Sequence, residues 1–320
     1  MNALLNQKNR APLAFTVMAL LLLGVGMGQS WPFALAILNL CLISAIMSLG
    51  VNIQWGYAGL LNLGVMGFTA LGGLAAVLVS EAPVLEAWSV GGQGMVVSFI
   101  LVVITIVLAI LVYRNMAASW QRRLTLAGLF IGAYFVINHF YAPAVYAIEN
   151  VDPATYGFLG GMGMPVIFSW VLGGVMAAGV AWVIGKITLG LRSDYLAIAT
   201  LGISEIIIAV LKNEDWLARG VKNVAGLDRP VPFELNLQTT PWFIDLVKSL
   251  FSGRLSSLAD AQRTDALHQL VIQSSSIFVK LCYTGLFTVV LIVVLLLSIK
   301  ALNSPWAVSY THLTLPTTAI

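Results

Sequence analysis

The sequence predicts an all-α, polytopic helical membrane protein, and three observations support this fold class. Of the 320 residues, 59% are hydrophobic and only 9% are charged, whereas soluble domains are typically about 25% charged. The apolar residues form continuous runs of about 17 to 23 residues, the length of a membrane helix, and do not alternate as in a β-barrel. Both cysteines, Cys41 and Cys282, lie inside apolar runs, which argues against a disulfide framework.

Eight segments are apolar enough to be membrane helices, so about eight spans are expected. They cover residues 11–28, 32–51, 59–80, 95–113, 124–141, 165–185, 195–211 and 277–299. Lys8 and Arg10 precede the first segment, as in a signal peptide. Its apolar run is long for a signal peptide and further spans follow, so we interpret it as an uncleaved helix.

The charges between these segments predict their orientation. If the N-terminus is cytoplasmic, the cytoplasmic segments contain basic residues and a single acid, Asp194, while the short outside loops contain acids and no Lys or Arg. The basic residues are Lys8, Arg10, Arg114, Arg122, Arg123, Lys186, Arg192 and Lys300. The outside acids are Glu81, Glu86, Glu149 and Asp152. This distribution follows the positive-inside rule, which favours a cytoplasmic N-terminus.

One outside loop, residues 212–276, is long, polar and mixed in charge. Within it, PWFIDLVKSLF has apolar residues near helical spacing, which is typical of a helix lying on a membrane surface. Two interpretations of the whole loop remain open. It is either an insertion that packs over the helices or a docking surface for a partner outside the membrane.

The segment GYAGLLNLGVMGFTALGG, residues 56–73, concentrates six glycines in an apolar chain. Small residues let membrane helices approach closely, and this packing role is one interpretation. The adjoining Asn52 and Gln54 favour another, because polar, irregular backbone at membrane depth is tolerated only where protein or a water-filled cavity lines it. The segment therefore predicts a broken or re-entrant element beside a translocation path.

A second segment, LRSDYLAIATLGISEIIIAVL (residues 191–211), places Glu205 well inside a predicted span. A carboxylate there is costly and indicates a functional site, with a protonated structural carboxyl as the alternative. Paired, glycine-interrupted segments in two halves of a chain are a sequence indicator of a transporter's central site. We interpret residues 56–73 and 191–211 as such counterparts.

These two motifs resemble the permease subunits of ABC importers for branched-chain amino acids, specifically the LivM type. The resemblance lies in GYAGLLNLGVMGFTALGGLAA and LRSDYLAIATLGISEII and extends in segment order over residues 32–306. Ser193 stands where the family commonly has glycine, and Ile203–Ser204 replace Phe–Gly. The resemblance implies a half-channel in the bacterial inner (plasma) membrane, working by ATP-driven alternating access. It also implies four partners: a sister permease, two cytoplasmic ATPases and a periplasmic substrate-binding protein.

On this interpretation both motifs line the substrate path in the lipid bilayer. The expected path residues are Gly59, Asn62, Gly64, Thr200, Gly202 and Glu205. No catalytic residue, cofactor, metal or nucleic acid is expected, since His139, His268 and His312 are scattered without metal-ligand spacing. The nearest approach to a nucleotide-binding loop, VAWVIGKI at 180–187, lacks the first glycine and the final Ser or Thr. ATP hydrolysis must then come from partner subunits.

The domain prediction is one membrane permease domain over residues 1–303. In the family a cytoplasmic loop that binds the ATPase follows, and Ser304, Pro305 and Trp306 begin that motif here. The remaining AVSYTHLTLPTTAI, residues 307–320, departs from it. We interpret this tail as non-native and the chain as C-terminally truncated relative to the family, with a divergent natural terminus as the alternative.

Two other transport functions stay open from the sequence. The same kind of importer carries urea or short amides in relatives that share the glycine segment. A secondary transporter would use Glu205 as a proton or cation site. A membrane-embedded enzyme is disfavoured because no His, Asp and Glu cluster is present in the sequence pattern.

Overall fold

The computed structural model describes residues 7–57, 59–188, 190–224, 226–256 and 259–302. Every regular element in these ranges is a helix, and seven of the helices are long and apolar enough to cross a membrane. The predicted all-α, polytopic architecture is therefore confirmed. Ser304, Pro305 and Trp306, proposed to couple to an ATPase, and the tail 307–320 lie outside the described residues.

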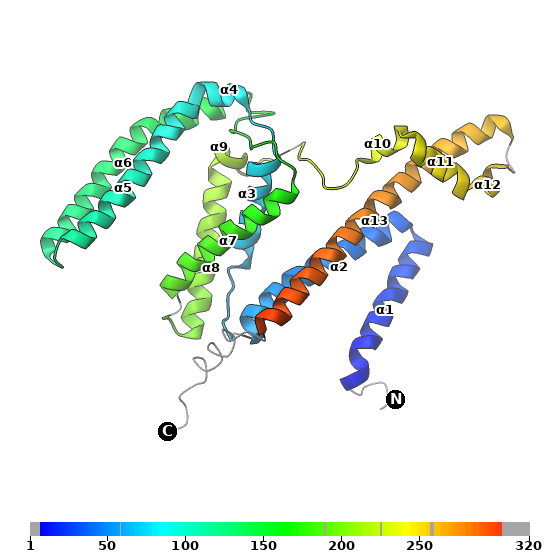
Figure 1. Ribbon diagram of the computed structural model, residues 1–320, viewed down its shortest axis with the longest axis horizontal. Helices are drawn as coiled ribbons and strands as arrows, with labels where there is room; N and C mark the ends of the chain where they lie inside the picture. Colours follow the sequence, from blue (N-terminus) through cyan, green and yellow to red (C-terminus); the bar gives the residue numbers. More distant parts are fainter. Residues whose placement is uncertain (1–6, 58, 189, 225, 257–258, 303–320) are drawn as a thin grey trace. The chain divides into compact units, whose positions relative to one another are not determined.

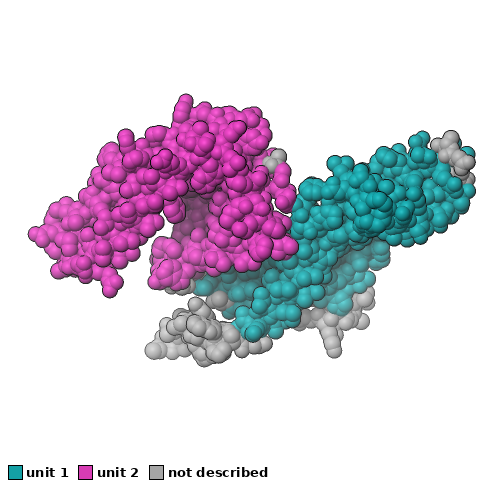
Figure 2. Space-filling model, turned by 45° about the horizontal axis from the view of Figure 1, so that its top comes forward, with its two compact units in different colours: residues 1–62, 229–320 teal, residues 63–228 magenta. Residues whose placement is uncertain are grey.

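The chain divides into two compact units, coloured teal and magenta in Figure 2. Unit 1 combines residues 1–62 with 229–320, and unit 2 is the continuous stretch 63–228. One boundary falls inside the glycine segment and the other inside the long loop predicted at 212–276. Each unit has its own packed helices, and the permease domain predicted over 1–303 stays a prediction.

Unit 1 contains three long helices and three short ones. They are α1 (Gln7–Gly28), α2 (Trp31–Asn52), α10 (Glu234–Thr239), α11 (Pro241–Leu250), α12 (Ser252–Ser256) and α13 (Asp260–Leu302). Ser30 caps α2 by accepting a hydrogen bond from the N–H of Phe33, and Pro32 fits the first turn, where its missing N–H is not needed. A π-helical turn, Ile53–Tyr57, follows α2 directly.

The helix α13 is longer than the apolar run 277–299 from which it was predicted. Its 43 residues extend over about 65 Å, roughly twice the thickness of a bilayer core. The polar N-terminal part projects beyond the apolar run and binds α10 to α12 (Figure 1). The buried side chains at this junction are Val231, Leu237, Phe243, Val247, Leu255, Leu270, Val271 and Val279. Much of the predicted outside loop is therefore helical and packs on α13.

Unit 2 contains two groups of helices. Its elements are α3 (Val65–Ser80), α4 (Leu85–Ala87), a π-helical turn at Trp88–Gly92, α5 (Gln93–Asn115), α6 (Trp120–Glu149), α7 (Ile167–Thr188), α8 (Ser193–Asn213) and α9 (Asp215–Ala218). The helices α5 and α6 form an antiparallel pair, and α3 packs against both α7 and α8 (Figure 1).

The helix α3 is shorter than the span predicted at 59–80. It begins only at Val65 and has 16 residues, about 24 Å, whereas a bilayer core is about 30 Å thick. Residues 59–64 are not helical, so the break expected in the glycine segment is present. The polar groups at the ends of a short helix need partners from the protein itself, and these partners define the candidate site.

Candidate functional site

The N-terminus of α3 is capped by hydroxyl groups of another helix. Gly64 occupies the cap position and has no side chain to bind the free N–H groups of the first turn. Ser204 of α8 supplies the missing cap: its Oγ accepts a hydrogen bond from the N–H of Gly67 at 2.8 Å. Thr200, one turn earlier, accepts from the N–H of Leu63 at 3.2 Å. Both hydroxyl residues are buried.

Gly67 explains why the glycine segment approaches α8 so closely. A Cβ at this position would lie 2.9 Å from Ser204 Oγ and 3.1 Å from its Cα, distances that a real side chain does not tolerate. The backbone of α3 therefore contacts α8 directly. Gly67 was not among the predicted path residues, although its place three residues after Gly64 is the position whose N–H a cap residue normally binds.

Gly202 and Glu205 lie on the exposed side of α8, away from α3. They are three residues apart and so share one face of the helix. Ile198 and Ile206 on this side are also exposed. The structure thus separates the predicted residues of α8 into two faces: Thr200 packs on α3, while Gly202 and Glu205 lie on a surface that no described part of unit 2 covers.

Gly59 and Asn62, the other two predicted path residues, belong to unit 1. Gly59 adopts a positive φ of 65°, a turn conformation that glycine takes without strain. The Asn62 side chain donates to Gln54 Oε1 at 2.8 Å, and the N–H of Leu60 donates to the Gln54 carbonyl at 3.0 Å. Gln54 therefore holds the irregular chain after the π-helical turn, an arrangement that satisfies polar groups inside the protein.

A second polar contact joins α2 and α13 in unit 1, and the sequence analysis missed it. Lys280 lies inside the apolar run 277–299, and its Nζ donates to the carbonyl of Pro32 at 3.0 Å. Asn39 donates to the Lys280 carbonyl at 3.2 Å and accepts from the Thr284 hydroxyl at 2.7 Å. A long basic side chain in an apolar run can thus place its polar end on a carbonyl near a helix end.

The C-terminal end of α3 is bound by backbone groups of residues 159–164. The carbonyls of Leu78, Val79 and Glu81 accept from the N–H groups of Met162, Met164 and Gly163 at 3.0, 2.8 and 2.8 Å. Gly161 permits this close approach, because a Cβ at this position would clash with the carbonyl oxygens of the same turn. Both ends of the short helix are thus satisfied by protein.

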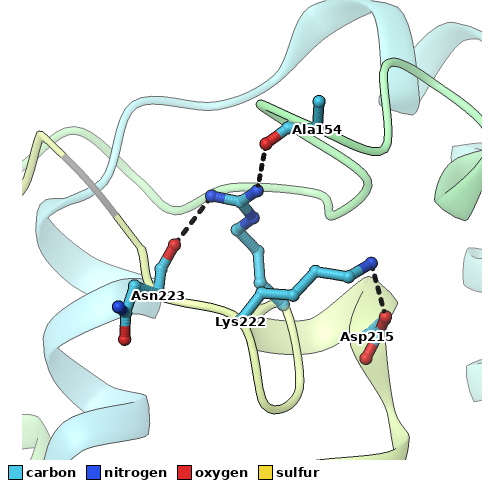
Figure 3. Close-up of polar contacts among 5 residues, drawn as sticks. Ala154, Asp215, Lys222 and Asn223 are labelled. Atoms are coloured by element: carbon cyan, nitrogen blue, oxygen red, sulfur yellow. Dashed lines mark hydrogen bonds and ion pairs between the residues drawn. The ribbon is translucent and has the colours of Figure 1, made fainter.

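A polar cluster after α8 holds the same loop in place. The buried Arg219 donates to the carbonyl of Asn223 at 2.7 Å and to that of Ala154 at 2.6 Å. Lys222 pairs with Asp215 at 2.9 Å (Figure 3). Figure 3 shows that these contacts bind the chain after α8 to Ala154, a residue before the 159–164 stretch. Together they fix one end of unit 2.

Metal binding has no support among the described ranges, where no three His, Cys, Asp or Glu side chains lie close enough together to hold an ion. The hydroxyls, amides and backbone groups described above are suited to hydrogen bonding, to helix contact and to lining a polar route.

Comparison with known proteins gives one local similarity. No protein-family model matches the chain, and no solved structure matches it. Over 69 residues, 22% of the chain, the sequence is 36% identical to the high-affinity branched-chain amino acid transport system permease protein LivM of Escherichia coli (strain K12). The matched stretch corresponds to 16% of that protein's length. The chain is a polytopic membrane protein with local similarity to a transport permease.

Proposed function

We propose that this chain is the membrane permease subunit of an ABC importer that moves branched-chain or related amino acids into the cytoplasm. The observation that carries the proposal is the 36% identity over 69 residues to a branched-chain amino acid permease protein. The two motifs around Gly64 and Glu205 resemble the same kind of subunit. Helices without a nucleotide-binding loop agree with a permease that relies on separate ATPases.

The exposed face of α8 supports a path or subunit boundary there. Glu205 is twelve residues after Ser193, about 18 Å along a helix of about 31 Å, and so lies near the middle of the span. A charged side chain at the bilayer centre costs about 2.5 to 3.5 kcal/mol on insertion scales. A face that exposes Glu205 beside Gly202 is therefore better placed against water or another protein than against lipid.

The proposed machine follows from the resemblance. A sister permease covers the Gly202–Glu205 face, two cytoplasmic ATPases drive alternating access, and a periplasmic binding protein delivers the substrate. The N-terminus lies on the cytoplasmic side of a bacterial inner membrane, the orientation that the basic residues between the helices favour. Ser304, Pro305 and Trp306 begin the segment that contacts an ATPase.

Transport measurements test this proposal directly. Right-side-out vesicles containing the chain with the proposed partner subunits are given radiolabelled leucine or urea, with ATP depleted or the proton gradient collapsed. We expect leucine uptake that requires ATP and survives an uncoupler. Uptake that follows the proton gradient and ignores ATP would establish the secondary transporter, and ATP-dependent uptake of urea alone would establish the amide importer.

Replacing the mid-span carboxylate tests the path. Glu205→Leu should lower the initial rate of leucine uptake by an order of magnitude or more while the protein still inserts, because the polar lining is lost at the centre of the bilayer. Glu86→Leu is the matched control, since this exposed carboxylate lies in the short helix α4, at the very start of an apolar helical stretch and not at mid-span. Equal uptake in both variants would remove Glu205 from the path.

A further inference from the structure

The short helix α11 has a wider apolar face than α13 covers. Phe243 and Val247 are buried, at 1% exposure each, in the junction with α13. Trp242, Leu246 and Leu250 recur every four residues beside them and are 54%, 42% and 70% exposed. Residues spaced in this way form one stripe along a helix. The polar Asp245 and Lys248 lie on the other side and pair with each other at 3.3 Å.

Two contacts fix the depth of α11 relative to the membrane. The Trp242 ring lies 6.1 Å from the ring of Phe278, the second residue of the apolar run 277–299. Lys280, two residues further, binds the carbonyl of Pro32 in the first turn of α2. The apolar part of α13 and the start of α2 therefore begin at the same level, and Trp242 lies within about one helical turn of it.

The direction of α11 agrees with a position at the surface of the membrane. Figure 1 shows α11 crossing α13, a helix that spans the membrane, so α11 extends across the bilayer surface and does not continue along the span. Trp242 contacts Phe278, which lies nearer the apolar end of α13 than the junction residues Leu270 and Val271 and next to Val279. The exposed stripe that begins with Trp242 therefore faces the lipid side.

We propose that α11 is an interfacial anchor whose Trp242–Leu246–Leu250 stripe lies among the lipid headgroups and the first acyl carbons of the leaflet entered by α2 and α13. Tryptophan at this level is typical of membrane interfaces, where its ring is amphipathic. An amphipathic helix with one charged side and one aromatic and leucine side lies in the interface plane. The exposed Trp31 at the start of α2 extends the same aromatic level.

The anchor goes beyond the transport proposal and is independent of substrate. It holds the projecting part of α13 at a defined height, because α11 is joined to that helix through Phe243 and Val247. The apolar stripe left on the surface then contacts lipid and needs no protein partner.

Site-directed spin labels measure this depth. In a chain with Cys41 and Cys282 replaced by alanine, one label is placed by Leu250→Cys and a matched one by Asp245→Cys, on the polar side. The two positions are equally open in the protein, with 70% of Leu250 and 73% of the Asp245 side chain exposed. Power-saturation EPR in phospholipid nanodiscs then compares collisions with oxygen, enriched in lipid, and a water-soluble nickel chelate.

We expect the oxygen-to-nickel accessibility ratio to be severalfold higher at Leu250 than at Asp245. Leu246→Cys is a second label on the stripe and should agree with Leu250. Two labels equally accessible to nickel would place the stripe in water and overturn the proposal. A Leu250 label shielded from both reagents would also overturn it, because a protein would then cover the stripe.

Discussion

The two ends of α3 solve one problem by different means. Both expose backbone groups that a helix leaves unpaired, and in a membrane protein these groups need partners. At the N-terminal end, side-chain hydroxyls of Ser204 and Thr200 supply the acceptors. At the C-terminal end, backbone N–H groups of residues 162–164 supply the donors. A side chain can rotate to accommodate an added atom more easily than backbone can move. Added volume should therefore cost more stability at the C-terminal end of α3 than at its N-terminal end.

Gly161→Ala should give the largest loss of stability. The added Cβ would meet the carbonyl oxygens of Val77, Leu78 and Glu81, the last two at 2.8 Å. Overpacking typically costs 1 to 3 kcal/mol, and we expect about 3 kcal/mol because only backbone lies opposite. Denaturation in mixed micelles measures the free energy of unfolding. Gly73→Ala is the control, since a Cβ there meets nothing within 4 Å.

Gly67→Ala should have a smaller effect at the other end of the helix. Its nearest neighbour is the Ser204 hydroxyl, which can rotate, although the Ser204 Cα is also close at 3.1 Å. We expect a loss of about 1 to 2 kcal/mol by the same denaturation measurement. If Gly67→Ala proves more harmful than Gly161→Ala, the contrast between side-chain and backbone caps is wrong.

Ser204→Ala isolates the hydrogen bond from the close approach. The change removes the acceptor for the N–H of Gly67 without adding volume, and loss of a cap residue costs about 1 kcal/mol. Ser204→Thr is the matched variant. It keeps a hydroxyl at this position, so its stability should lie between those of Ser204→Ala and the parent protein. A neutral Ser204→Ala would show that the remaining contact from the N–H of Gly67 to the carbonyl of Gly64, at 3.2 Å, is sufficient.

Most of the helices could be predicted from the sequence, because long apolar runs dominate it. A long apolar run also hides a single polar residue within it. Lys280 lies in a run so hydrophobic that one basic side chain does not interrupt the pattern. Hydropathy also located only the apolar half of α13, since residues 260–276 are polar and become helical through packing on α11 and α12.

The candidate site was partly predictable. A glycine-rich, polar segment indicates a broken helix, and residues 59–64 are indeed irregular. The pairing of Gly67 with Ser204 joins positions 137 residues apart, and a single sequence carries no signal for such a contact. The two faces of α8 follow from helical spacing, but which face packs on α3 is decided by the tertiary structure.

The smallest predicted effect concerns Glu81, the residue directly after α3. Burial, and secondarily the negative charge of Asp228, raise the pKa of this carboxyl above its ordinary value of 4.5. The folded state then binds more protons than the unfolded state, so the stability associated with Glu81 is full below pH 4.5 and is lost as pH rises through the raised pKa. Glu81→Gln removes this loss, since the amide stays neutral.

The variant should therefore show a flatter decline of unfolding temperature between acid and neutral pH than the parent protein. Glu86→Gln is the control for the loss of one exposed carboxyl, since Glu86 lies in the short helix α4 just after Glu81. If both variants keep the parent protein's slope, the C-terminal end of α3 does not hold Glu81 in a desolvated position. Backbone capping by residues 162–164 would then act on that end alone.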